Sequence, residues 1–386
     1  MTESSQLTFA TLGLFTGIEQ YENFPRLAEL LPSRRMEASA TPRPWEVDEP
    51  VDAPVDYEFA GSRHSFDAFL EETRTAALLM VHRGRIRFER YALTGGVDVP
   101  WISMSVAKSF VSALVGIAVG EGLVGSIDDP ISSYIRTEPG SAYDGISIRD
   151  VLQMSSGAAW NEDYSDPDSD AHRLMSAFTD GSTLEDLVAN MRRELQPGTV
   201  CRYNSGETQA LGNLLVAVTG GNLSDYMQSR LCEPLGFTSP GHWLIDSAGN
   251  EAAFAGLNLT ARDYARFGEL YLRAGSGGGR GVVPAEWVKA SVAPDSPHLQ
   301  VGALTMDGQP VPLGYGYQWW IPESDRGEFA AIGVYNQFIH VDPSRDVVIV
   351  KLSANPAYGT TTDEAENREG ESLAVLRALA AQVDAS

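Results

Sequence analysis

The sequence predicts an α+β fold with one antiparallel sheet that is built from both ends of the chain and flanked by helices. A helical subdomain is inserted at about 125–255. A hairpin pattern occupies 77–91, helices and loops dominate 125–255, and strand patterns return over 314–353. Strands at both ends with helices between them favour a sheet that the two ends share. We expect a functional site in the cleft between the sheet and the helical subdomain.

The chain has 386 residues, 43% of them hydrophobic, which is enough to bury a sizeable core. Residues 1–58 are predicted to be an N-terminal extension and linker, and 59–386 the functional domain. The linker prediction rests on prolines among acidic residues, Pro42, Pro44, Pro50 and Pro54. The first 20 residues lack the basic segment of an export signal, and no apolar stretch is long enough to span a bilayer. We therefore expect a cytoplasmic protein.

The first elements of the functional domain are a hairpin and a buried helix. Residues 77–81 and 86–91 read as strands joined by a turn over 82–85. From Ser105 the apolar residues follow a helical period and occupy nearly every face, with Ser103 or Ser105 placed to start the helix. Such a helix belongs in the interior.

The later elements are two helices, several strands and a final helix. Helices are expected at 207–219, ended by two glycines, and at 260–274, capped by Thr260. The remaining expected elements are strands over 314–321, 329–341 and 346–353, with a turn over 342–345 between the last two, and a helix over 364–383.

The charge and the content of cysteine and histidine indicate which binding partners, compartment and metal sites the sequence favours or disfavours. The formal net charge is −24, which disfavours binding to nucleic acid or to an anionic membrane. The two cysteines, Cys201 and Cys232, are too few for a disulfide framework and suit a reducing compartment. The six histidines show no metal-ligand spacing, and His340 is expected to be structural. No metal or cofactor is predicted.

The sharpest chemical motif is S-x-x-K at Ser105–Lys108, at the start of the buried helix. Residues three apart share a helix face, so the lysine amine can reach the serine hydroxyl. Burial lowers the pKa of a lysine, which lets it act as a base for the serine. Only three lysines occur in the chain, the others being Lys289 and Lys351. Because a lysine in a buried helix is rare, we interpret Ser105 as a nucleophile and Lys108 as its base.

Two further segments can complete the site. Tyr203 lies in Tyr203-Asn204-Ser205, and we expect protonated Lys108 to lower the pKa of its phenol so that it can pass protons. Gly333 and Val334 lie in the expected strand over 329–341. The glycine would let a substrate approach the strand, and the N–H of Val334 could join that of Ser105 in holding an oxyanion. A simple bulge at Gly333 is an equally good reading.

These motifs, in this order, resemble the serine β-lactamases and penicillin-binding proteins. The resemblance spans about residues 60–380 and implies a β-lactamase/DD-peptidase-like fold. Three further stretches resemble that superfamily: 151–157, 256–263 and 315–320.

Within the superfamily, the chain looks most like the 6-aminohexanoate-dimer hydrolases and related esterases. Ser205 at the end of the tyrosine motif, the loop over 161–167 and the G-[IV]-x-x-Q pattern over 333–337 suggest this. The resemblance implies a small amide or ester as substrate, a possible homodimer, and contacts to the substrate from four residues: Tyr164, Ser205, Gly333 and Asn336. A surface-packing role for Tyr164 is as plausible as a substrate contact.

The chain also departs from the superfamily pattern. Ala331-Ile332-Gly333 stands where β-lactamases have K-T-G, so the cation that binds a β-lactam carboxylate is missing. Three hypotheses remain open: an amide hydrolase on short amino-acid oligomers, a carboxylesterase, and a non-catalytic binding protein. The natural substrate cannot be deduced from the sequence, because loop shape sets the pocket.

Overall fold

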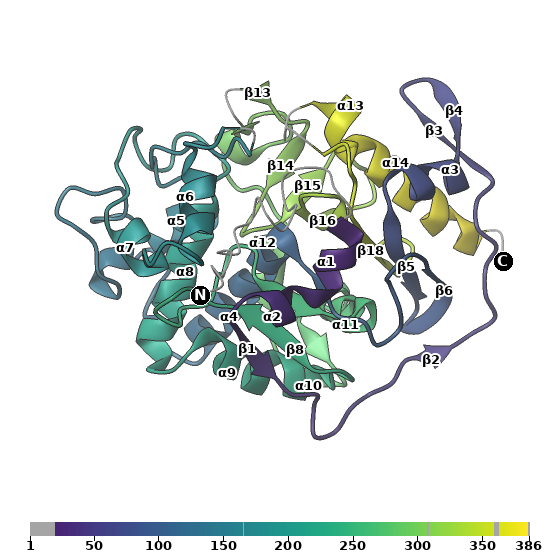
Figure 1. Cartoon of the computed structure of the whole chain (residues 1–386), viewed down its shortest axis with the longest axis horizontal. Helices are drawn as coiled ribbons and strands as arrows, with labels where there is room; N and C mark the ends of the chain where they lie inside the picture. The colour runs from purple at the N-terminus through teal and green to yellow at the C-terminus, as the bar shows by residue number, and fades with distance from the viewer. Residues whose placement is uncertain (1–19, 165, 307–308, 359–362, 385–386) are drawn as a thin grey trace, which may run out of the picture.

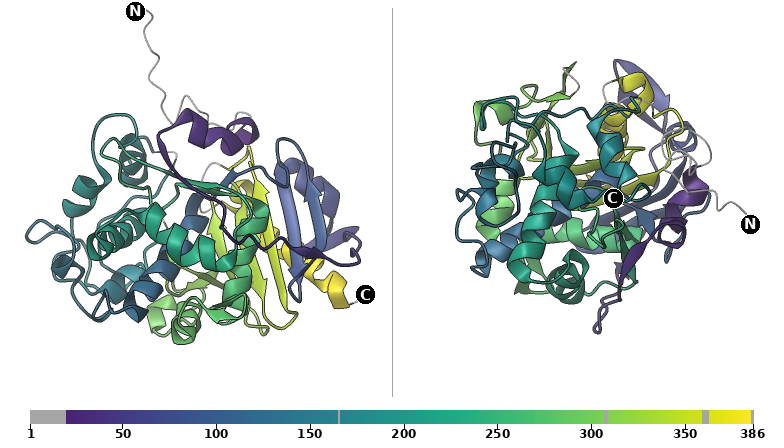
Figure 2. Two further views of the ribbon diagram at one scale, coloured as in Figure 1. Left: turned by 90° about the horizontal axis from the view of Figure 1, so that it is seen from below. Right: turned by 60° about the vertical axis from the view of Figure 1, so that its left-hand side comes forward.

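The computed structural model describes residues 20–164, 166–306, 309–358 and 363–384, and its central element is an eight-stranded sheet (Figure 1). The strand order is β14-β15-β16-β17-β18-β5-β6-β2, and every neighbouring pair is antiparallel except β2 and β6. The strands are β2 (Glu46–Val47), β5 (Thr75–His82), β6 (Arg85–Tyr91), β14 (Leu313–Tyr315), β15 (Trp320–Pro322), β16 (Phe329–Gly333), β17 (Gln337–Asp342) and β18 (Val347–Ser353). Because β18 pairs with β5, the two ends of the chain meet in one sheet, as predicted (Figure 2).

Helices cover both faces of this sheet, because successive residues of its strands point to opposite faces and both faces are apolar. Val348 and Val350 of β18 face the core that contains α4 (Ala107–Gly120) and α11 (Ala261–Leu272). Val347 and Ile349 face the other core, which contains α3 (Phe66–Glu72) and α14 (Glu369–Ala380). The predicted α+β class is therefore confirmed.

The inserted part of the chain is helical. Its helices are α5 (Ile148–Leu152), α6 (Asp170–Ser176), α7 (Leu184–Ala189), α8 (Ser205–Thr219), α9 (Leu223–Met227) and α10 (Glu233–Leu235). The Asn204 side chain caps α8, which ends at Gly220 in the left-handed conformation, and Thr260 caps α11 as expected. Across the part of the chain described, no helix has both the length and the apolar character that a membrane crossing requires.

The N-terminal segment is packed more closely than the predicted linker. It contains α1 (Gln20–Asn23), α2 (Leu27–Leu30) and β1 (Ser33–Met36). Phe24, Met36 and Trp45 are buried in the main core. β1 joins a second sheet in the order β1-β8-β9-β7, with β7 (Trp101–Ile102), β8 (Gly241–Leu244) and β9 (Leu257–Leu259). The domain boundary at residue 58 stays a prediction.

Three predicted elements are interrupted. The expected strand over 329–341 is two strands, because Tyr335 and Asn336 adopt positive φ and reverse the chain between β16 and β17. The expected strand over 314–321 is likewise a hairpin of β14 and β15. The expected last helix is divided at Arg368, whose φ of 53° separates α13 (Glu364–Asn367) from α14. Each break depends on a left-handed residue or a turn that side-chain patterns do not reveal.

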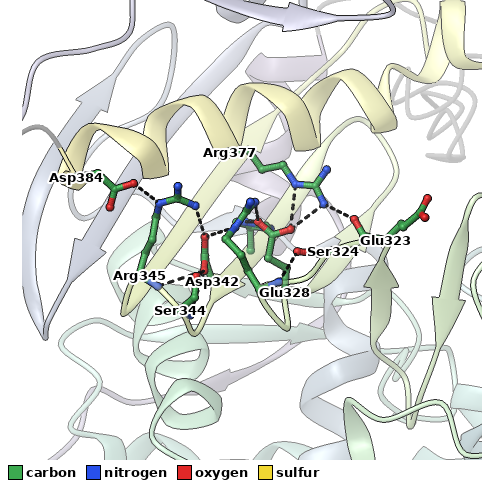
Figure 3. A network of polar contacts seen from close by, with 10 residues as sticks. Glu323, Ser324, Glu328, Asp342, Ser344, Arg345, Arg377 and Asp384 are labelled. Atoms are coloured by element: carbon green, nitrogen blue, oxygen red, sulfur yellow. Dashed lines mark hydrogen bonds and ion pairs between the residues drawn. The ribbon is translucent and has the colours of Figure 1, made fainter.

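Ion pairs fasten the C-terminal helix to the sheet (Figure 3). The buried carboxylate of Glu328 accepts hydrogen bonds from the Nε and Nη2 of Arg377 on α14, at 3.0 and 2.7 Å. The buried Asp342 binds Arg345, which in turn contacts Asp384 near the C-terminus. His340 is fully buried beside this network, and burial lowers its pKa to about 4 against the opposing charge of Glu328. Its imidazole is thus neutral, in keeping with the predicted structural role.

Candidate active site

Ser105 and Lys108 lie one helical turn apart at the start of the buried helix. Ser105 is in a short 3₁₀ turn over Met104–Val106 that leads directly into α4. Ser103 stands at the N-cap position of this turn, one of the two expected starts, although its side chain makes no capping hydrogen bond. Met104, just before the nucleophile candidate, has a φ of 45°, a conformation that non-glycine residues adopt at an energetic cost.

Lys108 is only 2% exposed, and its amine has three oxygen partners. It donates to the hydroxyls of Ser105 at 2.9 Å and Ser205 at 3.0 Å, and to the Phe254 carbonyl at 3.0 Å. Burial lowers its pKa to about 8, while the charge of Glu162 acts in the opposite direction. A substantial fraction of the amine is therefore unprotonated in mildly alkaline solution, as a general base requires.

Beyond Ser205 the hydrogen bonds lead to a buried carboxylate. The Ser205 hydroxyl donates to Glu162 Oε1 at 2.6 Å, and the Ser205 N–H donates to Glu162 Oε2 at 3.1 Å. Tyr164 also donates to Oε1, at 2.6 Å, and the Trp160 indole donates to Oε2. Lys108, Ser205 and Glu162 thus form a continuous chain that starts at the nucleophile candidate.

Tyr203 reaches the same point from the loop before α8. The Lys108 amine lies 5.1 Å from the centroid of its ring, which stacks on Trp320. Burial and the charge of Glu162 raise the pKa of Tyr203 well above its usual value, and a hydrogen bond with Ser105 only partly opposes them. The expectation that Lys108 lowers this pKa is therefore wrong, because burial dominates. Tyr203 is a neutral phenol and can donate a proton.

The end of β16 lies against the nucleophile segment at Gly333. A Cβ on this glycine would come within 2.7 Å of the Ser103 carbonyl oxygen and 2.9 Å of the Ser105 nitrogen. The glycine thus lets the backbone of the nucleophile segment approach this closely. This close approach places the neighbouring Val334 beside Ser105. The expected contact of Gly333 with the substrate stays a prediction.

A narrow cavity lies over these groups. Its volume is about 20 Å³, and its polar lining is Ser105, Glu162, Tyr164 and Ser205. The apolar lining consists of Met104, Ala171, Met175, Phe254, Ala255 and Val334. The structure thus brings together most of the residues predicted from the sequence.

Asn336 is the exception. It is fully buried, and its amide nitrogen donates to the Asn367 carbonyl at 2.6 Å. The predicted substrate contact from Asn336 is therefore wrong, because the turn between β16 and β17 directs its side chain toward α13.

Three groups that contact the candidate active site were not predicted from the sequence. Glu162 lies in the loop that carries Tyr164, and its role becomes visible only when that loop meets Ser205. The Phe254 carbonyl leaves no side-chain signal at all. Gln337 belongs to the recognised G-[IV]-x-x-Q pattern, but its contacts depend on two other strands, β7 and β18, and on the turn after β16.

Comparison with known proteins identifies relatives of this chain. A profile of the Beta-lactamase family matches residues 63–373. The chain is 31% identical to the 6-aminohexanoate-dimer hydrolase of Paenarthrobacter ureafaciens over 343 residues, which cover 86% of this chain and 85% of that one. It is 28% identical to the lovastatin esterase of Penicillium rubens over 154 residues, 36% of each chain.

Solved structures show the same fold. A Bacillus anthracis protein provisionally assigned as a 6-aminohexanoate-dimer hydrolase superposes with a TM-score of 0.82 at 21% identity, covering 95% of both chains. Together with the profile match, which spans most of the sequence, these likenesses show that the chain belongs to the Beta-lactamase family.

Proposed function

We propose that the protein is a serine hydrolase that cleaves small amide or ester substrates through an acyl-enzyme, in the manner of an amidase similar to 6-aminohexanoate-dimer hydrolase. One observation carries the proposal: the amine of Lys108 is shared between the hydroxyls of Ser105 and Ser205 at 2.9 and 3.0 Å inside a buried site. The relative with 31% identity supports the amide substrate class.

In the proposed acylation, Ser105 Oγ attacks the substrate carbonyl and its proton passes to Lys108 Nζ. The N–H groups of Ser105 and Val334 hold the oxyanion. Tyr203, a neutral phenol, donates its proton to the leaving amine or alcohol and is reprotonated from Lys108. The bond between the carbonyl carbon and the leaving group breaks, and the acyl group stays on Ser105.

Deacylation reverses the same proton transfers. Water attacks the acyl carbonyl, its proton goes to Lys108, and Ser105 recovers a proton as the acid is released. The negative charge of Glu162, one hydroxyl beyond Lys108, stabilises the protonated amine that forms in both steps.

The decisive test is Ser105→Ala. We expect hydrolysis of p-nitrophenyl butyrate to fall to the background rate, and a fluorophosphonate to label the wild-type protein on Ser105 alone, as measured by peptide mass spectrometry. Full turnover by Ser105→Ala would refute the proposal. Labelling of Ser105 without any turnover of esters or amides would favour a non-catalytic binding protein.

A carboxylesterase is the second candidate, and the apolar lining favours it. Met104, Met175 and Phe254 are among the residues that line the cavity, and no arginine or lysine is among the described residues that line it. The oxygens of Glu162 are already bound to protein donors. Turnover of 6-aminohexanoate dimer compared with p-nitrophenyl butyrate distinguishes the two candidates. A chromogenic cephalosporin in the same panel tests for β-lactam hydrolysis.

A further inference from the structure

The two proposed oxyanion donors are carried by separate segments of the chain. The N–H of Ser105 follows β7 through Ser103 and Met104, whereas the N–H of Val334 follows β16. Both segments contain non-glycine residues at positive φ: Met104 at 45° on one side, and Tyr335 and Asn336 at 64° and 66° on the other. This conformation is energetically costly for a residue other than glycine, so surrounding contacts must hold these residues in place.

A single buried amide contacts both segments. Gln337 is fully buried at the start of β17. Its Oε1 accepts from the Trp101 indole of β7 at 3.1 Å. Its Nε2 donates to the carbonyls of Val334 at 3.1 Å and Tyr335 at 3.2 Å. The amide therefore connects the segment before Ser105 to the turn that carries Val334.

The backbone of β18 fixes the orientation of this amide. Ser353 donates its N–H to Gln337 Oε1 at 3.0 Å, and its carbonyl accepts from Nε2 at 2.6 Å. The oxygen thus faces two donors and the nitrogen faces three acceptors. In a flipped amide the Nε2 hydrogens would face the N–H groups of Trp101 and Ser353, and Oε1 would face carbonyl oxygens. Only the observed orientation therefore satisfies the contacts.

We propose that Gln337 is a positioning residue that sets the spacing between the N–H groups of Ser105 and Val334 and so shapes the oxyanion hole. This inference rests on the proposed serine hydrolase function. Gln337 does not touch the substrate; it acts through Trp101 on one side and through the Val334 carbonyl on the other. Because oxyanion stabilisation depends on donor placement within tenths of an ångström, losing this amide lowers the rate of the chemical step rather than substrate binding.

The test compares Gln337→Met with wild type on p-nitrophenyl butyrate and on its thionoester, in which sulfur replaces the carbonyl oxygen. Sulfur is a weaker hydrogen-bond acceptor and sits farther from carbon, so a hole shaped for oxygen favours the oxygen ester. We expect kcat for the oxygen ester to fall about 10–100-fold, within the range known for lost oxyanion donors. KM should change less than threefold, and the oxygen-to-sulfur ratio of kcat/KM should fall at least fivefold.

Gln318→Met is the matched control. Gln318 is another buried glutamine, and its amide binds the carbonyls of Val151 and Leu152 and the hydroxyl of Thr208. We expect it to lower the thermal midpoint while the oxygen-to-sulfur ratio stays at the wild-type value. If Gln337→Met slows both substrates equally, or slows neither, the inference is wrong.

Two further variants keep the result interpretable. If Gln337→Met does not fold, Trp101→Phe removes the indole hydrogen bond and leaves a smaller aromatic ring at this buried position. A threefold lower oxygen-to-sulfur ratio would support the inference and an unchanged ratio would overturn it. Ser105→Ala tests the proposed function separately. If Ser105→Ala is inactive and Gln337→Met keeps the wild-type oxygen-to-sulfur ratio of kcat/KM, the proposed hydrolase function is supported and only the role of Gln337 is refuted.

Discussion

Two lysines are both buried and both bound to a serine hydroxyl, yet one belongs to the candidate active site and the other does not. Lys108 and Lys351 are 2% and 0% exposed, and each donates to a serine hydroxyl, that of Ser105 or Ser353. Burial lowers the pKa of both amines. A buried lysine with a serine partner is therefore not in itself a sign of catalysis.

The difference lies in what surrounds each pair. The hydroxyl partners of Lys108 line a cavity, and one of them leads to the carboxylate of Glu162. The Ser353 hydroxyl instead meets the Thr75 hydroxyl in the sheet, and the Lys351 amine lies 5.2 Å from the Phe69 ring centroid. The nearby Arg368 lowers the pKa of Lys351 further, whereas Glu162 raises that of Lys108. A cavity and a counter-charge, rather than burial alone, distinguish Lys108, the candidate base, from Lys351.

The largest expected effect is the contrast in activity between Lys108→Met and Lys351→Met. Loss of the general base should lower kcat on p-nitrophenyl butyrate by about 10³-fold, within the range for proton-transfer groups. Lys351→Met should keep kcat within threefold of wild type. Similar losses in both variants, measured on protein with matched circular dichroism spectra, would show that the comparison is wrong.

An intermediate effect is expected from Glu162→Gln, because only the Lys108 site has a carboxylate. Its charge raises the pKa of Lys108, so its removal should lower that pKa further below about 8. The rise of kcat/KM with pH, which reports the unprotonated amine, should move to lower pH. The maximal rate should fall about 10-fold, because the protonated amine is less stabilised. If this rise of kcat/KM stays at the same pH or moves to higher pH, the assignment is contradicted.

The smallest expected effect is on stability and concerns Lys351→Met. The pKa of Lys351 is depressed in the folded protein, so at neutral pH the unfolded chain binds a proton that the folded protein resists. Folding therefore loses stability as pH falls below the unfolded value of 10.5. The methionine variant should gain about 1 kcal/mol at pH 7, reduced by the lost hydrogen bond to Ser353.

This gain should shrink as pH approaches 10, because wild type then folds with a neutral lysine at little cost. Urea unfolding at pH 7 and pH 9.5 measures it. A destabilisation of equal size at both pH values would mean that the Ser353 contact outweighs the buried charge.

Local sequence patterns determined a large part of this protein. The S-x-x-K spacing placed Ser105 and Lys108 on one helix face, because the helical period is a local property. The apolar runs over 77–81 and 346–353 predicted the strands β5 and β18 that join the two ends of the chain. Thr260 marked the start of α11 through a cap that needs only neighbouring residues.

Tertiary structure alone decided the rest, because those features depend on contacts between residues far apart in the chain. Tyr335 and Asn336 reverse the chain at positive φ, which the residue types alone did not predict. Contacts from neighbouring residues such as Gln337 hold this turn in place. Glu162 gains its role 43 residues away from Ser205, and Gln337 contacts Trp101 across 236 residues. The role proposed for Lys108 likewise depends on burial, a backbone carbonyl and a distant carboxylate, which only the folded chain brings together.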